Sequence, residues 1–211
     1  MNFAVQWRKP AQPKGKSPLA ILFHGRTSNE RDIMAQAGSA IPEGVAVASL
    51  RGPIPVDEGG YTWFVNRGLG RPVGESLRAS VDRIHGWIDG IDVAEFDTSR
   101  LILVGFSAGM LIASAVLLDR PDRFFGAVLL AGTFPWDNDA VSGTPAKLRG
   151  KPIFYARGDR DTVIPMDLVE RSVDYLKGES DAILTMKLYP LEHEISSDER
   201  RDIASWIDSV L

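Results

Sequence analysis

The segment Gly105-Phe106-Ser107-Ala108-Gly109 carries the strongest chemical signal in the chain, because it has the pattern G-x-S-x-G. A short apolar run, Leu101–Val104, precedes it, and an apolar helical run, Met110–Leu118, follows it. This context predicts a sharp strand-to-helix turn that exposes the serine hydroxyl. The start of the helix then directs free amides at developing negative charge. The pattern predicts Ser107 as a nucleophile for acyl transfer. The alternative is a serine that caps a glycine-rich helix start.

A serine nucleophile needs a base, and the chain has only three histidines: His24, His85 and His193. In α/β hydrolases the catalytic groups follow the chain order serine, acid, histidine, and only His193 satisfies that order. It follows the last predicted strand, at the edge where open α/β sheets bind ligands. The alternative is a solvated loop histidine between two glutamates. We expect a packing or surface role for His85, which lies on a predicted helix, and a loop-fixing role for His24.

The acid that would orient the histidine should follow the predicted strand Ile153–Ala156. Two aspartates, Asp159 and Asp161, stand there in Arg157-Gly158-Asp159-Arg160-Asp161. One would orient the imidazole and stabilise its protonated form, and the other would make turn or capping hydrogen bonds. Spacing alone does not decide between them.

The elements that must position these residues alternate between short apolar strands and longer helices. The predicted strands are Phe3–Trp7, Leu19–Phe23, Val45–Leu50, Leu101–Gly105, Ala127–Ala131, Ile153–Ala156 and Ile183–Tyr189. The predicted helices are Glu30–Ile41, Glu75–Ile91, Ala108–Leu118, Met166–Lys177 and Ser197–Val210. Several strands are apolar on both faces, as in a parallel sheet covered by helices. The pattern predicts one domain over residues 1–211 with an open, doubly wound α/β fold.

The segment Arg51–Gly74 is rich in glycine and proline and too long for a simple connection. Loops of this length in compact domains are usually functional or disordered, so we expect this one to wall a pocket. No insertion is large enough to build a separate lid domain.

The composition narrows the function classes. The chain has 211 residues, of which 44% are hydrophobic and 25% charged, with a net charge of −4 and no dense basic block. Nucleic acid and anionic membrane surfaces are therefore not expected partners. The chain has no cysteine, which removes disulfides, thiolate metal sites and a cysteine nucleophile. It shows no signal-peptide pattern and no apolar run long enough for a membrane span. We expect a cytoplasmic protein that is not integral to a membrane.

The chain resembles the phospholipase/carboxylesterase family of α/β hydrolases, which includes acyl-protein thioesterases and small bacterial esterases. The resemblance covers nearly the whole chain and depends on several short motifs. These are His24-Gly25, Arg51-Gly52-Pro53, Trp63-Phe64, Gly105-Phe106-Ser107-Ala108-Gly109, Gly158-Asp159-Arg160-Asp161 with Val163 and Pro165, and His193-Glu194.

The resemblance implies the α/β-hydrolase fold, with a mostly parallel central sheet and helices on both faces. It places the acid at the second aspartate of its motif, which favours Asp161 over Asp159. It also implies an oxyanion hole formed by the backbone N–H groups of Arg26 and Ala108. The chain departs from the family at Thr27, where members often carry glycine, and at Arg157, where they often carry histidine.

We therefore expect two-step ester or thioester hydrolysis through an acyl-enzyme on Ser107, with no metal and no organic cofactor. Trp63, Phe64 and Phe134 are candidates for an apolar acyl pocket, although such aromatics are more often core residues. A small, uncovered site favours short acyl or aryl esters. The rivals are acyl transfer to another acceptor, lactone opening with the same triad, and a catalytically silent binding protein. The sequence leaves room for a homodimer.

Overall fold

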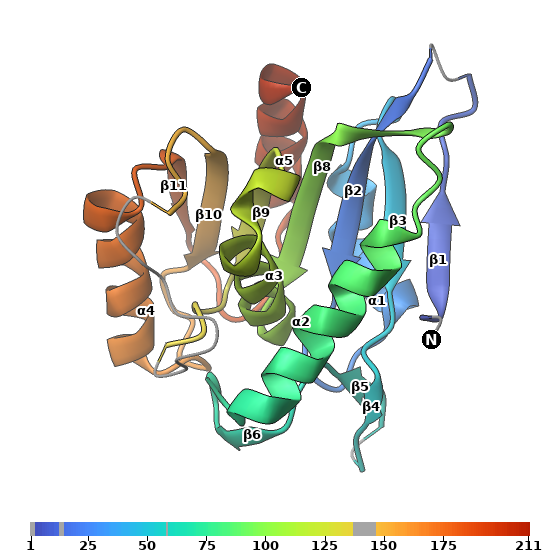
Figure 1. Cartoon of the computed structure of the whole chain (residues 1–211). Coiled ribbons are helices and arrows are strands. Elements are labelled where there is room, and N and C mark those ends of the chain that lie inside the picture. The colour runs from blue at the N-terminus through green and yellow to red at the C-terminus, as the bar shows by residue number, and fades with distance from the viewer. Residues whose placement is uncertain (1–2, 13–14, 58, 137–146) are drawn as a thin grey trace.

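The architecture, taken from a computed structural model, is a central sheet with helices on both faces (Figure 1). The structure describes residues 3–12, 15–57, 59–136 and 147–211. Seven strands follow one another across the sheet in the order β1-β3-β2-β8-β9-β10-β11. They are β1 Val5–Arg8, β2 Ser17–Phe23, β3 Ala46–Leu50, β8 Phe96–Phe106, β9 Gly126–Leu130, β10 Pro152–Gly158 and β11 Ile183–Tyr189. Only β1 runs antiparallel to its neighbour in this sheet. The mostly parallel sheet expected from the sequence is confirmed.

In the described part of the chain five α-helices cover the sheet, and they divide between its two faces. They are α1 Glu30–Gln36, α2 Gly74–Asp89, α3 Ala108–Asp119, α4 Met166–Asp174 and α5 Ser197–Val210. The core cluster on one face contains the apolar side chains of α2, α3 and α4, whereas the cluster on the other contains those of α1 and α5. Because strand side chains alternate, Leu19 and Ile21 enter the first cluster and Ala20 and Leu22 the second. This arrangement explains why β2 reads as a continuous apolar run.

Two predicted helices are shorter than the sequence suggests. The expected helix over residues 30–41 ends at Gln36 and is followed by a 3₁₀ turn, Gly38–Ala40. The expected helix over residues 166–177 ends at Asp174 and continues as a π-helical turn, Tyr175–Glu179. A further 3₁₀ turn, Pro121–Arg123, follows α3. Apolar spacing persists through such turns, so the pattern does not mark where the α-helix ends.

The long segment between β3 and α2 contains two small hairpins that the sequence analysis missed. The first pairs β4, Ile54–Pro55, with β5, Tyr61–Thr62. The second pairs β6, Asn66–Gly68, with β7, Arg71–Pro72. Strands this short do not produce an alternating pattern of the four or more residues that a sequence prediction needs.

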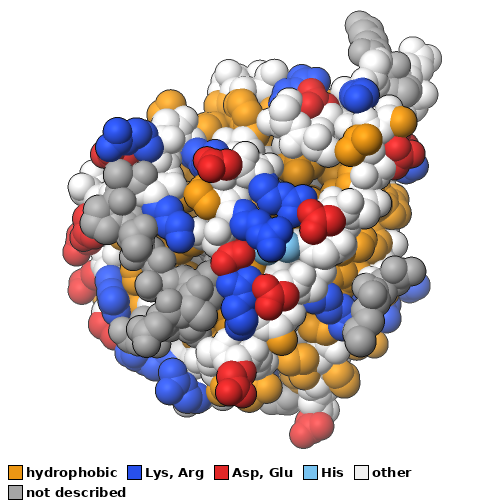
Figure 2. All heavy atoms as spheres, viewed as in Figure 1, with side chains coloured by type: hydrophobic (Ala, Val, Ile, Leu, Met, Phe, Trp, Pro, Cys, Tyr) orange, Lys and Arg blue, Asp and Glu red, His pale blue; other side chains and the backbone are white. Residues whose placement is uncertain are grey.

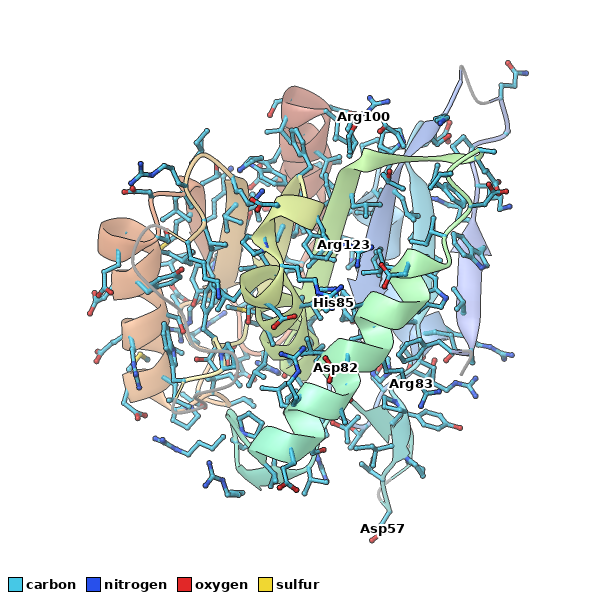
Figure 3. All side chains as sticks on the ribbon, in the orientation of Figure 1. Asp57, Asp82, Arg83, His85, Arg100 and Arg123 are labelled. Carbon is cyan, nitrogen blue, oxygen red and sulfur yellow. The ribbon has the colours of Figure 1, made fainter. Side chains whose placement is uncertain are left out.

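A cluster of charged side chains lies over α2 and α3, on the face shown in Figure 2, and surrounds His85. Figure 3 labels His85 with Asp82 and Arg123 in this region. The His85 side chain is 1% exposed, and its Nε2 atom lies 3.1 Å from Asp119 Oδ2. Burial lowers the pKa of His85 to about 4, so the ring is neutral at neutral pH. The expected packing role of His85 is confirmed.

No helix in the described part of the chain is both long and apolar enough to cross a membrane.

Candidate active site

Ser107 occupies a strained turn between β8 and α3. Its backbone has φ 58° and ψ −119°, which non-glycine residues rarely adopt. Such strain costs on the order of 1–3 kcal/mol and persists only where the surroundings enforce it. Here the Ser107 N–H donates to the carbonyl of Leu130 at 2.9 Å, which ties the turn to the neighbouring strand β9. The predicted strand-turn-helix context of Ser107 is thus present.

The two glycines of the motif are required by close backbone packing. A Cβ atom on Gly105 would overlap the carbonyl oxygen of Gly109, and one on Gly109 would overlap the carbonyl oxygen of Phe23 in β2. Because neither glycine has a side chain, α3 can begin in contact with the sheet, with its N-terminus beside Ser107.

His193 forms hydrogen bonds on both sides of its ring. Its Nε2 atom lies 2.8 Å from Ser107 Oγ, and its Nδ1 atom lies 2.8 Å from Asp161 Oδ2. A neutral imidazole with its proton on Nδ1 donates to the carboxylate and accepts from the serine hydroxyl. The ring also lies against Phe106, with 4.9 Å between ring centroids. The structure therefore brings together the serine, histidine and one of the two aspartates that the sequence offered.

Asp161 and Asp159 lie in different environments. Asp161 is 4% exposed, and its second oxygen, Oδ1, accepts a hydrogen bond of 3.0 Å from the Val163 N–H. Asp159 is exposed, and its carboxylate lies 3.9 Å from Arg160. The expectation that the other aspartate makes the turn hydrogen bond is wrong, because Asp161 makes that bond as well as the one to His193.

Arg157, which departs from the family pattern, holds the loop that carries Asp161. Its Nη2 atom donates to the Asp161 carbonyl oxygen at 2.7 Å, and its Nη1 atom lies 3.6 Å from Met166 Sδ. The side chain is largely buried between β10 and α4. The departure at this position thus bears on the loop beside the acid, as expected.

The two backbone segments expected to form the oxyanion hole lie on either side of Ser107. Ala108 is the first residue of α3, so its N–H has no acceptor within the helix. On the other side, a Cβ atom added to Gly25 would lie 3.5 Å from Ser107 Cβ, so the start of the 25–30 loop comes close to the serine. Arg26 and Ala108 both line one pocket with Ser107.

His24 holds this loop in the way the sequence analysis expected. Its Nδ1 atom lies 2.7 Å from the Gly25 carbonyl, and its Nε2 atom accepts from the Gly52 N–H at 2.9 Å. The ring is fully buried, and burial lowers its pKa, so it remains neutral. With Nδ1 protonated, both ring nitrogens are used in structural hydrogen bonds.

A small pocket of about 40 Å³ opens beside Ser107. Its apolar walls are Phe64, Leu69, Leu111, Val163 and Ile164. Phe64, a candidate from the sequence, lies in this wall. Leu111 was missed, although it lies in the first turn of α3, directly after Ser107.

Trp63 and Phe134, the other two candidates, are not among the described residues that line this pocket, and both side chains are fully buried. The Trp63 indole donates to the His24 carbonyl at 2.8 Å and packs against Phe23. Phe134 packs against Trp136 and Tyr175, with ring centroids 5.6 and 5.3 Å away. For these two aromatics the core interpretation holds.

Among the described residues, no group of three or more histidine, aspartate or glutamate side chains is arranged to hold a metal ion.

Comparison with known proteins gives a consistent picture. The sequence profile of the phospholipase/carboxylesterase family matches residues 9–211. Carboxylesterase SOBER1 of Arabidopsis thaliana is 28% identical over 141 residues, which are 66% of this chain and 61% of the relative. The putative esterase NocK of Nocardia uniformis subsp. tsuyamanensis is 30% identical over 169 residues, 75% of this chain and 44% of that protein. The matches thus span less than two thirds of these relatives.

Solved structures support the fold. The carboxylesterase of Bacillus cereus has a TM-score of 0.85 to this chain at 22% identity, covering 99% of this chain and 95% of the other. A carboxylesterase from Mesorhizobium loti has a TM-score of 0.79 at 20% identity, with 92% and 90% covered. At these identities the likeness establishes the α/β-hydrolase fold.

Proposed function

Since the chain belongs to the phospholipase/carboxylesterase family, we propose that it is a serine hydrolase that cleaves carboxylic esters or thioesters through an acyl-enzyme on Ser107. The observation that carries this proposal is the continuous hydrogen-bonded chain from Ser107 through His193 to Asp161, with both links at 2.8 Å. These are the distances over which a base takes the proton of a nucleophile and an acid orients the base.

In the first step His193 Nε2 takes the hydroxyl proton as Ser107 Oγ attacks the substrate carbonyl carbon. The carbonyl oxygen becomes an oxyanion, which the backbone N–H groups of Arg26 and Ala108 would stabilise, each donor being worth roughly 3 kcal/mol. His193 then gives the proton to the leaving alcohol or thiol as the acyl-enzyme forms. Asp161 would stabilise the protonated imidazole between these transfers.

In the second step the same groups act on water. His193 removes a proton from a water molecule, which attacks the acyl carbon, and the proton returns to Ser107 Oγ as the free acid leaves. Every proton in the cycle is carried by this chain's own residues and by water.

The size of the pocket supports small acyl groups as substrates. The pocket beside Ser107 is only about 40 Å³, which favours a short acyl group over a long chain. Phe64 and Leu111 supply apolar surface for such a group. We also propose that residues 1–211 form one catalytic domain and that the protein is cytoplasmic, as the sequence predicts.

The test is hydrolysis of p-nitrophenyl esters from acetate to octanoate by the wild type and by Ser107→Ala. We expect kcat/KM to be highest for acetate and to fall with chain length. Removing the nucleophile should lower activity at least about 10³-fold without changing the thermal melt. Ser107→Ala activity within tenfold of the wild type would contradict the proposed nucleophile.

A further inference from the structure

The loop that carries the Arg26 amide contains a second strained residue. Thr27 has φ 64°, a left-handed conformation that is a clear outlier for a β-branched side chain. Its hydroxyl donates to the carbonyl of Arg26 at 2.6 Å. Glycine adopts this conformation without cost, so threonine at this position needs contacts that hold it there.

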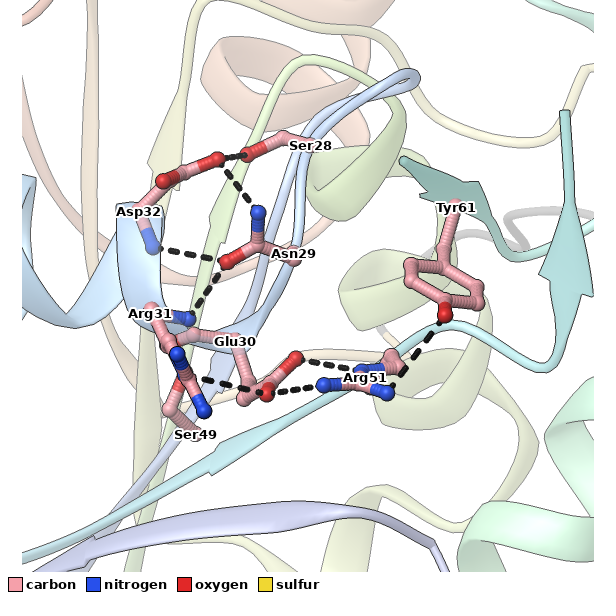
Figure 4. Close-up of polar contacts among 8 residues, drawn as sticks. All are labelled: Ser28, Asn29, Glu30, Arg31, Asp32, Ser49, Arg51 and Tyr61. Atoms are coloured by element: carbon pink, nitrogen blue, oxygen red, sulfur yellow. Dashed lines mark hydrogen bonds and ion pairs between the residues drawn. The ribbon is translucent and has the colours of Figure 1, made fainter. Parts of the chain in front are cut away.

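An ion pair between the buried Glu30 and the partly exposed Arg51 anchors the end of this loop. Glu30, the first residue of α1, is 5% exposed, and both of its carboxylate oxygens accept hydrogen bonds from Arg51 (Figure 4). Arg51 Nε lies 2.7 Å from Oε2, and Arg51 Nη2 lies 2.5 Å from Oε1. Hydrogen bonding to Arg51 lowers the pKa of Glu30, so the carboxylate is ionised at neutral pH. The Ser49 hydroxyl also donates to the Glu30 carbonyl at 2.7 Å.

The segment that supplies Arg51 also contacts the strained part of the loop. The Tyr61 N–H donates to the Ser28 carbonyl at 2.8 Å, and the Tyr61 ring lies under the Arg51 guanidinium, 4.8 Å from its centre. A Cβ atom on Gly60 would overlap the Thr27 carbonyl oxygen, so these two backbones are in close contact. Arg51, Gly60 and Tyr61 therefore contact the loop just after Arg26, at Thr27, Ser28 and Glu30.

We infer that the Glu30–Arg51 pair positions the oxyanion hole by holding the Arg26–Thr27 turn against its strain. This inference rests on the proposed function, since it assigns a role in the same reaction. Neither side chain lines the pocket beside Ser107 in the described structure, so both are positioning residues rather than catalytic ones. A bidentate contact between a guanidinium and a carboxylate fixes the relative orientation of the two groups as well as the distance between them. The ammonium group of a lysine would fix only the distance.

Ion pairs at the surface contribute little to stability, and buried ones contribute little compared with apolar residues of the same shape, so stability alone is a weak reason for this partly buried pair. A misplaced Arg26 amide would weaken binding of the oxyanion in the transition state while leaving ground-state binding of the ester unchanged. The expected signature is therefore a fall in kcat with little change in KM.

The experiment compares Arg51→Lys and Glu30→Gln with the matched control Arg78→Lys. Arg78 makes the same kind of two-point contact with Asp119, at 2.7 and 3.2 Å, between α2 and α3. We expect each of the two loop variants to lose roughly 10- to 100-fold in kcat with KM within about threefold of the wild type. Arg78→Lys should keep wild-type kcat, and thermal melts show whether the three variants lose similar stability.

A second readout reports the oxyanion directly. A reversible trifluoromethyl ketone forms a hemiketal with Ser107, whose oxyanion occupies the hole, so its inhibition constant should rise by the same factor as kcat/KM falls. In the Arg51→Lys background, Thr27→Gly should restore at least about half of the loss in kcat, measured on a logarithmic scale. The reason is that glycine adopts the left-handed conformation without strain and so does not need the ion pair to hold it.

The outcomes separate this inference from the proposed function. If the wild type hydrolyses esters while Arg51→Lys and Glu30→Gln keep its kcat and inhibitor affinity, the pair is only structural and the inference is overturned. Equal losses of kcat in the control Arg78→Lys would also overturn it, since the effect would then follow stability. A wild type without esterase activity would overturn both proposals.

Discussion

At the scale of single residues, the site depends on differences in burial between side chains that are neighbours in sequence. Asp161 is buried against His193, while Asp159, two positions earlier, faces solvent. The direction of each side chain follows from how the loop after β10 turns. Arg157 fixes that turn through its hydrogen bond to the Asp161 carbonyl oxygen. The order of the catalytic groups along the chain was sufficient to select His193. Burial depends on tertiary structure, so the spacing of residues 157–161 did not show which aspartate is the acid.

Asp161→Asn should lower kcat by up to about 10⁴-fold with little change in folding. An amide offers the wrong hydrogen-bonding pattern to Nδ1, so the ring favours the tautomer whose Nε2 carries a proton and cannot accept one from Ser107. Asp159→Asn serves as the matched control and should keep activity within about twofold. Steady-state kinetics of both variants, with thermal melts, check this expectation. An inactive Asp159→Asn beside a normal Asp161→Asn would require a different acid.

At the scale of elements, the junction between β8 and α3 matters most. Ser107 is accessible because α3 begins directly against β2, and that approach leaves no room for a side chain at Gly109. The sequence predicts this junction well, because the motif that marks it, residues 105–109, is continuous in the chain. It predicts the wall of the pocket poorly: Trp63 and Phe134 do not line it, whereas Leu69 and Ile164, which the sequence did not suggest, do. Aromatic residue type alone does not show whether a ring faces a cavity or the core.

Two glycine substitutions test this account of packing. Gly109→Ala should destabilise the protein by at least about 2 kcal/mol and abolish activity, because the new methyl group overlaps the Phe23 carbonyl oxygen. Gly86→Ala, on an open face of α2, should instead stabilise it by about 0.5–1 kcal/mol, because a Cβ there meets no atom within 4 Å. Denaturant unfolding measures both values, and a neutral Gly109→Ala would contradict the close approach of α3 and β2.

At the scale of the whole molecule, the sheet gathers the site from distant parts of the chain. Ser107 follows β8, Asp161 follows β10, His193 follows β11 and Arg26 follows β2, all at the carboxyl edge of parallel strands. The alternation of strands and helices predicts that edge from sequence. The hairpins β4–β5 and β6–β7 lie between β3 and α2. They were not predictable, because their strands are only two or three residues long, and β5 is held by a bridge from Tyr61 to the distant Ser28.

The helix that follows the His193 loop, α5, has a buried glutamate in its first turn, and this residue affects the stability of the whole molecule. Ser196 caps α5 and accepts from the Glu199 N–H at 3.1 Å, and Glu199 is 1% exposed. Its Oε2 atom has no hydrogen-bond partner among the described residues. Burial raises the pKa of Glu199 to about 7, from an ordinary value near 4.5. The folded protein holds this proton more tightly than the unfolded chain does, so stability falls as pH rises from about 4.5 to 7.

Glu199→Gln should therefore raise stability at pH 8 by about 1–3 kcal/mol, or roughly 3–10 °C in melting temperature. Glutamine keeps the capping position and cannot ionise. The difference from the wild type should shrink to zero as pH falls below about 4.5. Glu75→Gln, an exposed change in the first turn of α2, is the control and should give no increase. A constant difference at every pH would show that ionisation of Glu199 is not the cause.

The most direct test of the central claim is covalent capture of the nucleophile. A fluorophosphonate should react with the wild type at one serine, and mass spectrometry of the digested protein should place the added mass on the peptide that contains Ser107. Labelling should be lost in Ser107→Ala and slowed at least about 10³-fold in His193→Ala, because the histidine must take the serine proton. A label on any other serine, or equal labelling of His193→Ala, would contradict the assignment of Ser107 as a nucleophile activated by His193.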